Sequence, residues 1–78
     1  PVVRYNSAEV NNMYLPRLRD LREDHDMTQA QIAAILGIDQ RVYSIYETGK
    51  RDIPLPHLVT LADYYKVSTD YLLGREKS

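Results

Sequence analysis

Apolar residues recur along the chain at the spacing of three or four that places side chains on one face of an α-helix. Two segments show this spacing: Tyr14, Leu18 and Leu21 with His25 in phase behind them, and Leu58, Leu61, Ala62 and Tyr65. Pro16 lies where a proline can open the first of these helices, and Pro54 and Pro56 separate the second from the segment before it. The pattern therefore predicts one helix near the N-terminus and another after the two prolines.

Three further helices are delimited by capping residues. Thr28 is a predicted N-cap whose capping box is completed by Gln31, and Gly37 supplies the stop. The same start and stop signals recur as Asp39 with Gly49 and as Ser68 with Gly74. All three glycines of the chain thus lie where a left-handed helix terminator is expected. Together with the two periodic segments, these signals predict an all-α domain of five helices.

Only Gly37, Ile38 and Asp39 join the second and third predicted helices, which is the length of a helix-turn-helix connection. At about 100° per residue, the helix after Asp39 divides into two faces. The face predicted to meet the core carries Val42, Tyr43 and Tyr46, and the opposite arc carries Gln40, Arg41, Ser44 and Thr48, with the apolar Ile45 at its edge. This arc is predicted to be free of the core.

The free arc has side chains that are suited to reading base edges in DNA. Gln can pair with adenine, Arg with guanine and Ser with either, and an aliphatic side chain can contact a thymine methyl group. The predicted base-reading residues are therefore Gln40, Arg41, Ser44 and Ile45. The alternative is that they are ordinary solvent-facing residues of a short amphipathic helix.

Residues around this arc are suited to the phosphate backbone. Gln29 lies at the start of a helix, where backbone N–H groups can hold a phosphate, and Lys50 and Arg51 directly follow the third helix. The predicted backbone contacts are completed by Thr28, Thr48 and Tyr43. Tyr43 is included because a tyrosine hydroxyl needs a partner when it is buried, and a phosphate within its reach could supply one.

Composition limits the other classes of function. Ten Lys and Arg against eleven Asp and Glu give a net charge of −1, so a positive DNA-binding surface must be local. His25 and His57 lie far apart without a ligand pattern, and no Walker loop, HExxH motif or nucleophile with a base is present, so no metal, cofactor or catalytic residue is expected. The absence of cysteine, of a signal peptide and of a long apolar run favours a cytoplasmic protein with no membrane role.

Several runs together resemble the phage-repressor/Cro helix-turn-helix family, also called XRE-like regulators. The resemblance covers residues 16–74 and is carried by residues 18–23 (LRDLRE), 27–33 (MTQAQIA), 36–38 (LGI), 46–51 (YETGKR), 61–62 (LA) and 67–74 (VSTDYLLG). It implies a compact five-helix, lambda-repressor-like domain that binds operator DNA as a dimer. The helix between Asp39 and Gly49 then enters the major groove.

The resemblance also implies roles for individual residues. Gln29 would contact a phosphate and brace Gln40. Arg22 and Glu47 match a family pair that is usually a buried ion pair tying the first helix to the third, and the alternative is two independent surface charges. The tyrosine content departs from the family, because Tyr43 and Tyr46 fill positions that commonly carry aliphatic residues.

Dimerisation is expected because one recognition helix reads too few base pairs to find a site in a genome. The predicted interface is Tyr71, Leu72 and Leu73, which give more apolar surface than a short terminal helix can bury in its own core. The alternative is that all three side chains pack inside the domain. The second choice is the segment from Val2 to Tyr5, a loose arm or an edge strand. The operator is then expected to be a pseudo-palindrome.

The predicted organisation is an N-terminal arm over residues 1–13, a DNA-binding domain over 14–74 and a tail over 75–78. The expected function is sequence-specific binding of double-stranded DNA as a homodimer that regulates transcription, with repression as the expected direction. The alternative is a module that holds a protein partner, such as the antitoxin of a toxin–antitoxin pair. Residues 1–13 are the candidate partner-binding tail for that alternative.

Overall fold

A computed structural model describes residues 14–75 of the chain. Five helices follow one another in this part: α1 (Pro16–Asp24), α2 (Gln29–Leu36), α3 (Gln40–Glu47), α4 (Leu55–Tyr65) and α5 (Thr69–Leu72). Residues 14–75 contain no strand, and the prediction of an all-α domain of five helices is confirmed. The predicted arm over residues 1–13, with its segment from Val2 to Tyr5, lies outside the described residues, as do residues 76–78 of the predicted tail.

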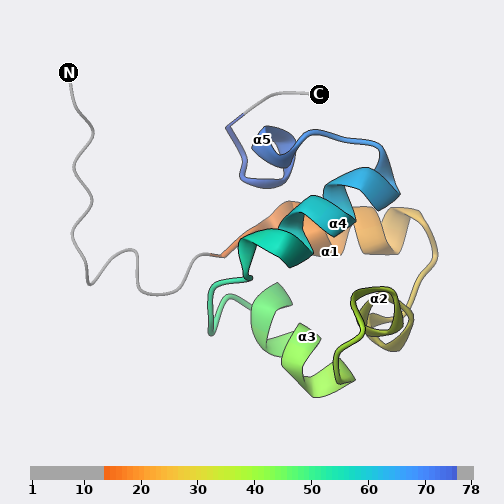
Figure 1. Cartoon of the computed structure of the whole chain (residues 1–78). Helices are drawn as coiled ribbons and strands as arrows, with labels where there is room; N and C mark the ends of the chain where they lie inside the picture. The colour runs from red at the N-terminus through yellow and green to blue at the C-terminus, as the bar shows by residue number, and fades with distance from the viewer. Residues whose placement is uncertain (1–13, 76–78) are drawn as a thin grey trace.

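The helices are arranged around α1 and α4, which cross the middle of the molecule (Figure 1). The short helix α5 lies on one side of this pair, and α2 and α3 lie on the other (Figure 1). α1 contacts both α3 and α5, and α4 contacts both α2 and α5. α2 and α3 therefore pack against the other helices on one side, and the opposite side of the pair is open to solvent.

One apolar core joins all five helices. It is formed by Leu15, Leu18, Ile32, Ala33, Tyr43, Ile53, Leu58, Leu61, Ala62, Tyr65 and Leu72, all of which are buried. α4 contributes four of these side chains, Leu58, Leu61, Ala62 and Tyr65, at the spacing that the sequence pattern predicts. Tyr14 and His25, which share the predicted face of the first helix, are instead exposed, so α1 meets the core mainly through Leu18.

The predicted capping residues are found at three helix starts. The Thr28 hydroxyl accepts the Gln31 N–H over 3.1 Å, and the Gln31 side-chain carbonyl accepts the Thr28 N–H over 2.8 Å, so the capping box is confirmed. Asp39 and Ser68 cap α3 and α5 in the same way through one side-chain oxygen each. These caps satisfy N–H groups that the first turn of a helix leaves without intrahelical partners.

The glycines end helices in the left-handed conformation, as predicted. Gly37, Gly49 and Gly74 have φ values of 71°, 79° and 78°. Gly49 is constrained a second time, because a Cβ at this position would lie 2.9 Å from the Tyr14 Cβ and 3.0 Å from the Tyr14 Cα. α4 ends without a glycine: Lys66 adopts a φ of 59°, and the Val67 N–H still reaches the Ala62 carbonyl over 3.0 Å.

α5 presents less apolar surface than was predicted for a dimer interface, because Leu72 is buried and Tyr71 and Leu73 are half-buried. Leu72 is 1% exposed in the chain's own core, and Leu73 packs against that core. The Tyr71 ring is covered by the Arg17 guanidinium, whose Cζ lies 3.9 Å from the ring centroid. The prediction of a dimer contact is wrong for Leu72, because α4 and α1 already bury the side chain that the sequence pattern leaves to a second copy.

Within the described part of the chain, no helix combines the length and the apolarity that a membrane crossing requires.

Candidate nucleic-acid interface

The inner face of α3 attaches this helix to the rest of the domain. Tyr43 is fully buried and Glu47 is 3% exposed. Of the other two residues predicted to face the core, Tyr46 is half-buried and Val42 is 37% exposed. α3 therefore meets the core along a narrow stripe through Tyr43 and Glu47, one turn apart.

Glu47 is held by a buried ion pair to α1. Arg22 Nη2 donates to Glu47 Oε1 over 2.8 Å, and Arg22 Nε lies 3.1 Å from each carboxylate oxygen. The two side chains are 14% and 3% exposed, and the hydrogen bonds to Glu47 raise the pKa of the Arg22 guanidinium. Arg22 Nη1 also donates to the Met27 carbonyl over 2.9 Å. One guanidinium thus connects α1, the α1–α2 turn and the end of α3.

Gln29, the first residue of α2, belongs to the same network. Its Nε2 donates to Glu47 Oε2 over 3.1 Å. Since the carboxylate is paired with Arg22 and can only accept, this contact fixes which side of the Gln29 amide faces inward. The second N–H of the amide is then left for a partner outside the network.

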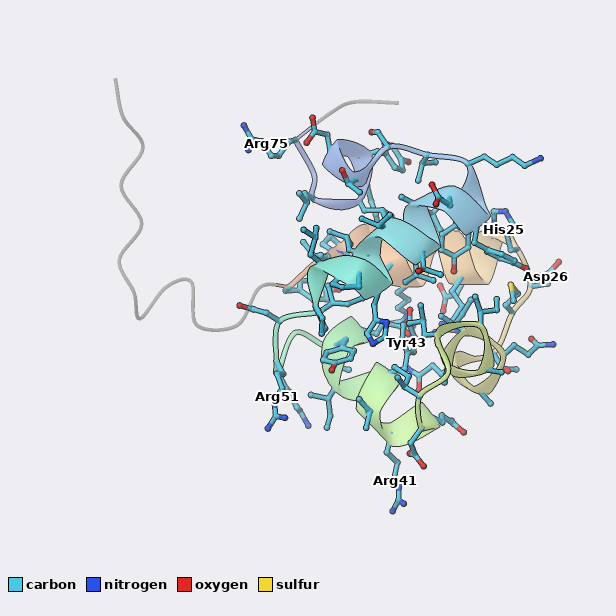
Figure 2. All side chains as sticks on the ribbon, in the orientation of Figure 1. His25, Asp26, Arg41, Tyr43, Arg51 and Arg75 are labelled. Carbon is cyan, nitrogen blue, oxygen red and sulfur yellow. The ribbon has the colours of Figure 1, made fainter. Side chains whose placement is uncertain are left out.

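The outer face of α3 is open to solvent. Gln40 and Arg41 are exposed, and the Arg41 side chain is 92% exposed. Ser44 and Ile45, one turn further along, are half-buried. Figure 2 shows Arg41 pointing away from the body of the molecule, at the same edge as Arg51, whereas Arg75 lies at the opposite edge.

Asp39 places a carboxylate at the start of this outer face. Its Oδ1 accepts the Arg41 backbone N–H over 2.7 Å, and this hydrogen bond lowers the pKa of the Asp39 carboxyl below its usual value. The same oxygen lies 3.4 Å from Arg41 Nε, which is long for a hydrogen bond. Asp39 therefore binds the Arg41 backbone N–H closely and the Arg41 guanidinium only weakly. The guanidinium can separate from Asp39 at a small cost in free energy.

The predicted backbone contacts surround this face, and they differ in what they can donate. The Thr28 hydroxyl uses a lone pair in its cap and keeps its hydrogen, whereas the Thr48 hydroxyl donates to the Ser44 carbonyl over 2.8 Å. Lys50 and Arg51 are both exposed just after α3. In this conformation Thr28 therefore has a hydrogen for a phosphate oxygen and Thr48 does not.

Tyr43 is not available to DNA. The residue is 0% exposed, and Figure 2 places it inside the molecule between α3 and the other helices. Burial raises the pKa of the Tyr43 hydroxyl, and raises that of Tyr65 to about 12. Neither hydroxyl has a partner at hydrogen-bond geometry among residues 14–75, although the Tyr43 hydroxyl lies close enough to Glu47 for that carboxylate to add to the rise in its pKa. The prediction that Tyr43 contacts the DNA backbone is wrong, because α3 turns this side chain into the core.

A polar pocket of about 280 Å³ lies where α1, α2 and α3 meet. It is lined by Tyr14, Arg19, Arg22, Gln29, Glu47 and Thr48. Arg19 was not among the predicted site residues, and neither the pocket nor the contact between Gln29 and Glu47 was predicted. The only sequence signal for Arg19 is its place one turn before Arg22, which puts both arginines on the same side of α1.

No group of three or more His, Cys, Asp and Glu side chains between residues 14 and 75 is placed to hold a metal ion.

Comparison with known proteins places this arrangement among DNA-binding regulators. The family model described as helix-turn-helix matches residues 18–72. The chain is 47% identical over 62 residues to the uncharacterized HTH-type transcriptional regulator YobD of Bacillus subtilis, a match that covers 80% of this chain and 55% of that protein. It is 39% identical over 59 residues to the cryptic phage CTXphi transcriptional repressor RstR of Vibrio cholerae, over 76% of this chain and 53% of that one.

A solved structure agrees with these sequence matches. The crystal structure of a transcriptional regulator from Listeria innocua superimposes with a TM-score of 0.76 at 26% identity, and covers 87% of this chain and 64% of that one. The chain spans about half the length of the curated relatives that it matches.

Proposed function

The chain belongs to the helix-turn-helix family, and from that premise we propose that it binds double-stranded DNA sequence-specifically, as a homodimer, and regulates transcription. α3 is the recognition helix and lies in the major groove. Gln40, Arg41, Ser44 and Ile45 read base edges, since they form the face of α3 that the core does not use.

The contrast between the two faces of α3 carries the proposal. Its inner face is held by Tyr43 in the core and by Glu47 in a buried ion pair. Its outer face carries an arginine that is 92% exposed. A helix whose inner face is fixed in the core can present the side chains of its outer face to a groove and lose little conformational entropy on binding.

The backbone contacts follow from the position of each group. Gln29 has a free amide N–H at the start of α2, and Thr28 keeps its hydroxyl hydrogen. Lys50 and Arg51 follow the end of α3 and neutralise phosphates beside the groove. This cationic edge supplies the local positive charge that a chain with a net charge of −1 needs.

Two copies are required because one short helix reads only a few base pairs. A two-fold dimer places its recognition helices about 34 Å apart, so the operator is a pseudo-palindrome with half-sites about 10 base pairs apart. Repression is the proposed direction of regulation, and the name of the relative RstR as a repressor supports it. A non-enzymatic role agrees with membership of a family of regulators.

Random-site selection with the whole chain tests the proposal. The expected outcome is an enriched pseudo-palindrome, and sedimentation of the protein with that duplex should show two chains for each site. A one-to-one complex would remove the homodimer and leave the helix-turn-helix assignment intact. Failure to enrich any sequence would contradict DNA reading and favour the alternative in which this fold holds a protein partner.

A further inference from the structure

The pocket between α1, α2 and α3 has the chemistry of an anion site. Two of the side chains that line it are arginines, Arg19 and Arg22, and its one carboxylate, Glu47, is already neutralised by Arg22. Its volume of about 280 Å³ is many times the roughly 30 Å³ that one water molecule occupies in the liquid. Gln29 adds an amide N–H that Glu47 leaves unused. The lining residues thus carry one net positive charge, which Glu23 balances through its ion pair with Arg19, and the pocket has room for a hydrated oxyanion.

Arg19 is an exposed member of this lining. Its side chain is 61% exposed, and its Nε is bound to Glu23 Oε2 over 3.0 Å in an ion pair between successive turns of α1. Exposed pairs of this kind contribute little to stability, so the guanidinium can exchange one anion for another. Its planar fork matches two oxygens of a phosphate as well as it matches a carboxylate.

We propose that Arg19 is a further ligand of the DNA backbone, which leaves Glu23 on binding and holds a phosphate at the mouth of the pocket beside Gln29. The inference rests on the proposed DNA binding and adds a residue to it. The expected occupant of the pocket is a DNA backbone phosphate, because two of the lining residues lie next to the groove-reading face. These are Gln29 at the start of α2 and Thr48 at the end of α3. Glu23 then competes with DNA for Arg19 and weakens binding.

Fluorescence anisotropy with a fluorescein-labelled, mixed-sequence DNA duplex tests the contact over a series of salt concentrations. Arg19→Ala should weaken binding about tenfold near 0.1 M salt and lower the slope of log affinity against log salt by about one. Arg19→Lys should keep that slope, since the charge remains. Arg75→Ala is the matched control, because this exposed cation lies at the edge opposite Arg41 (Figure 2), and its slope should equal that of the wild type.

Glu23→Gln tests the competition. The variant should bind the duplex about two- to fivefold more tightly than the wild type, and this gain should vanish in the double variant with Arg19→Ala. A gain that persists without Arg19 would overturn the competition, since Glu23 would then act only through its own charge.

The two proposals fail in different ways. If the wild-type chain binds no duplex and selects no site, the proposed function is wrong. If the wild type binds and Arg19→Ala matches Arg75→Ala in affinity and salt slope, DNA binding stands and the role of Arg19 is wrong. Thermal unfolding of each variant confirms that the fold is retained, which is expected for a side chain that is 61% exposed.

Discussion

The two ends of α3 are held by different interactions. The last turn is fixed from outside the helix: Glu47 is bound by Arg22 and Gln29, and Gly49 lies against Tyr14. In the first turn, Tyr43 is buried in the core and Asp39 caps the Arg41 N–H, but the Arg41 side chain extends into solvent. α3 is thus fixed along its inner face, with polar and steric contacts added at its C-terminal end, and its proposed reading residues lie on the outer face. Stability and recognition are therefore expected to separate along one helix.

Removal of the anchor should have the largest effect. Arg22→Ala leaves Glu47, which is 3% exposed, with Gln29 as its remaining protein partner. An uncompensated buried carboxylate is expected to cost about 3 kcal/mol or more in the free energy of unfolding, measured by urea denaturation. The exposed pair between Arg19 and Glu23 is the matched control, and Arg19→Ala should leave the free energy of unfolding nearly unchanged.

A double variant sharpens this prediction. Replacement of Arg22 and Glu47 together by a matched apolar pair should cost less than Arg22→Ala alone, since no charge is left buried. An unchanged melting temperature for Arg22→Ala would show that the last turn of α3 does not depend on this ion pair. The contrast between the two ends of the helix would then be lost.

Substitutions of exposed residues on and just after α3 should change DNA affinity and leave the stability of the fold unchanged. Arg41→Ala is expected to lower affinity for the selected site by about 1 to 3 kcal/mol and to relax the preference at one base position. Lys50→Ala should weaken binding to selected and scrambled duplexes alike, because a phosphate contact carries no sequence information. Competition binding with both duplexes measures the difference. Equal losses for Arg41→Ala on the two duplexes would make this residue a phosphate contact.

The glycines that follow α2 and α3, Gly37 and Gly49, allow a further comparison, between a strained backbone alone and a strained backbone with a steric clash. Gly37→Ala places a side chain in open space at a φ of 71°, so its cost is the left-handed conformation alone, about 1 kcal/mol. Gly49→Ala has the same backbone cost and also brings its Cβ within 2.9 Å of the Tyr14 Cβ. The expected total is about 2 kcal/mol by urea denaturation. Tyr14→Gly in the Gly49→Ala background should recover part of this loss, and no recovery would contradict the steric argument.

Local signals in the sequence predicted the elements of the fold well. The Thr28 capping box, the cap at Asp39 and the terminator at Gly37 act within a few residues, so the chain itself contains all the information that they need. α4 shows the limit of such signals: Lys66 ends the helix in the left-handed conformation, which no glycine marks.

The site was predicted less completely, because it depends on how helices lie against one another. The exposure of Gln40 and Arg41 and the inward direction of Tyr43 follow from the helical period, but the complete burial of the Tyr43 hydroxyl does not. The period gives the direction of a side chain, whereas the helices around α3 decide whether its hydroxyl reaches the surface. Leu72 was misplaced for the same reason, since a count of apolar residues does not show which of them α1 and α4 already cover.

Removal of a buried tyrosine hydroxyl tests how far the inner face of α3 is optimised for stability. Its expected effect on the free energy of unfolding is the smallest of those predicted. Tyr43 and Tyr65 bury hydroxyls that have no partner at hydrogen-bond geometry in residues 14–75. Tyr43→Phe removes a hydroxyl without a well-formed hydrogen bond while keeping the ring, so at pH 7 it should change the free energy of unfolding by no more than about 1 kcal/mol. Tyr14→Phe, in a ring that is 58% exposed, is the matched control and should have no effect.

The effects of these substitutions on the free energy of unfolding should differ more at high pH. Burial raises the pKa of both hydroxyls in the folded chain, to about 12 for Tyr65, whereas an unfolded tyrosine titrates near 10. Above about pH 10 the unfolded chain therefore loses protons that the folded chain keeps, and stability should fall by up to about 1.4 kcal/mol per pH unit for each tyrosine. Urea denaturation from pH 9 to 11 should show a shallower fall for Tyr43→Phe than for the wild type. Parallel curves would mean that Tyr43 ionises as easily in the folded chain as in the unfolded one, which would contradict its burial in the core.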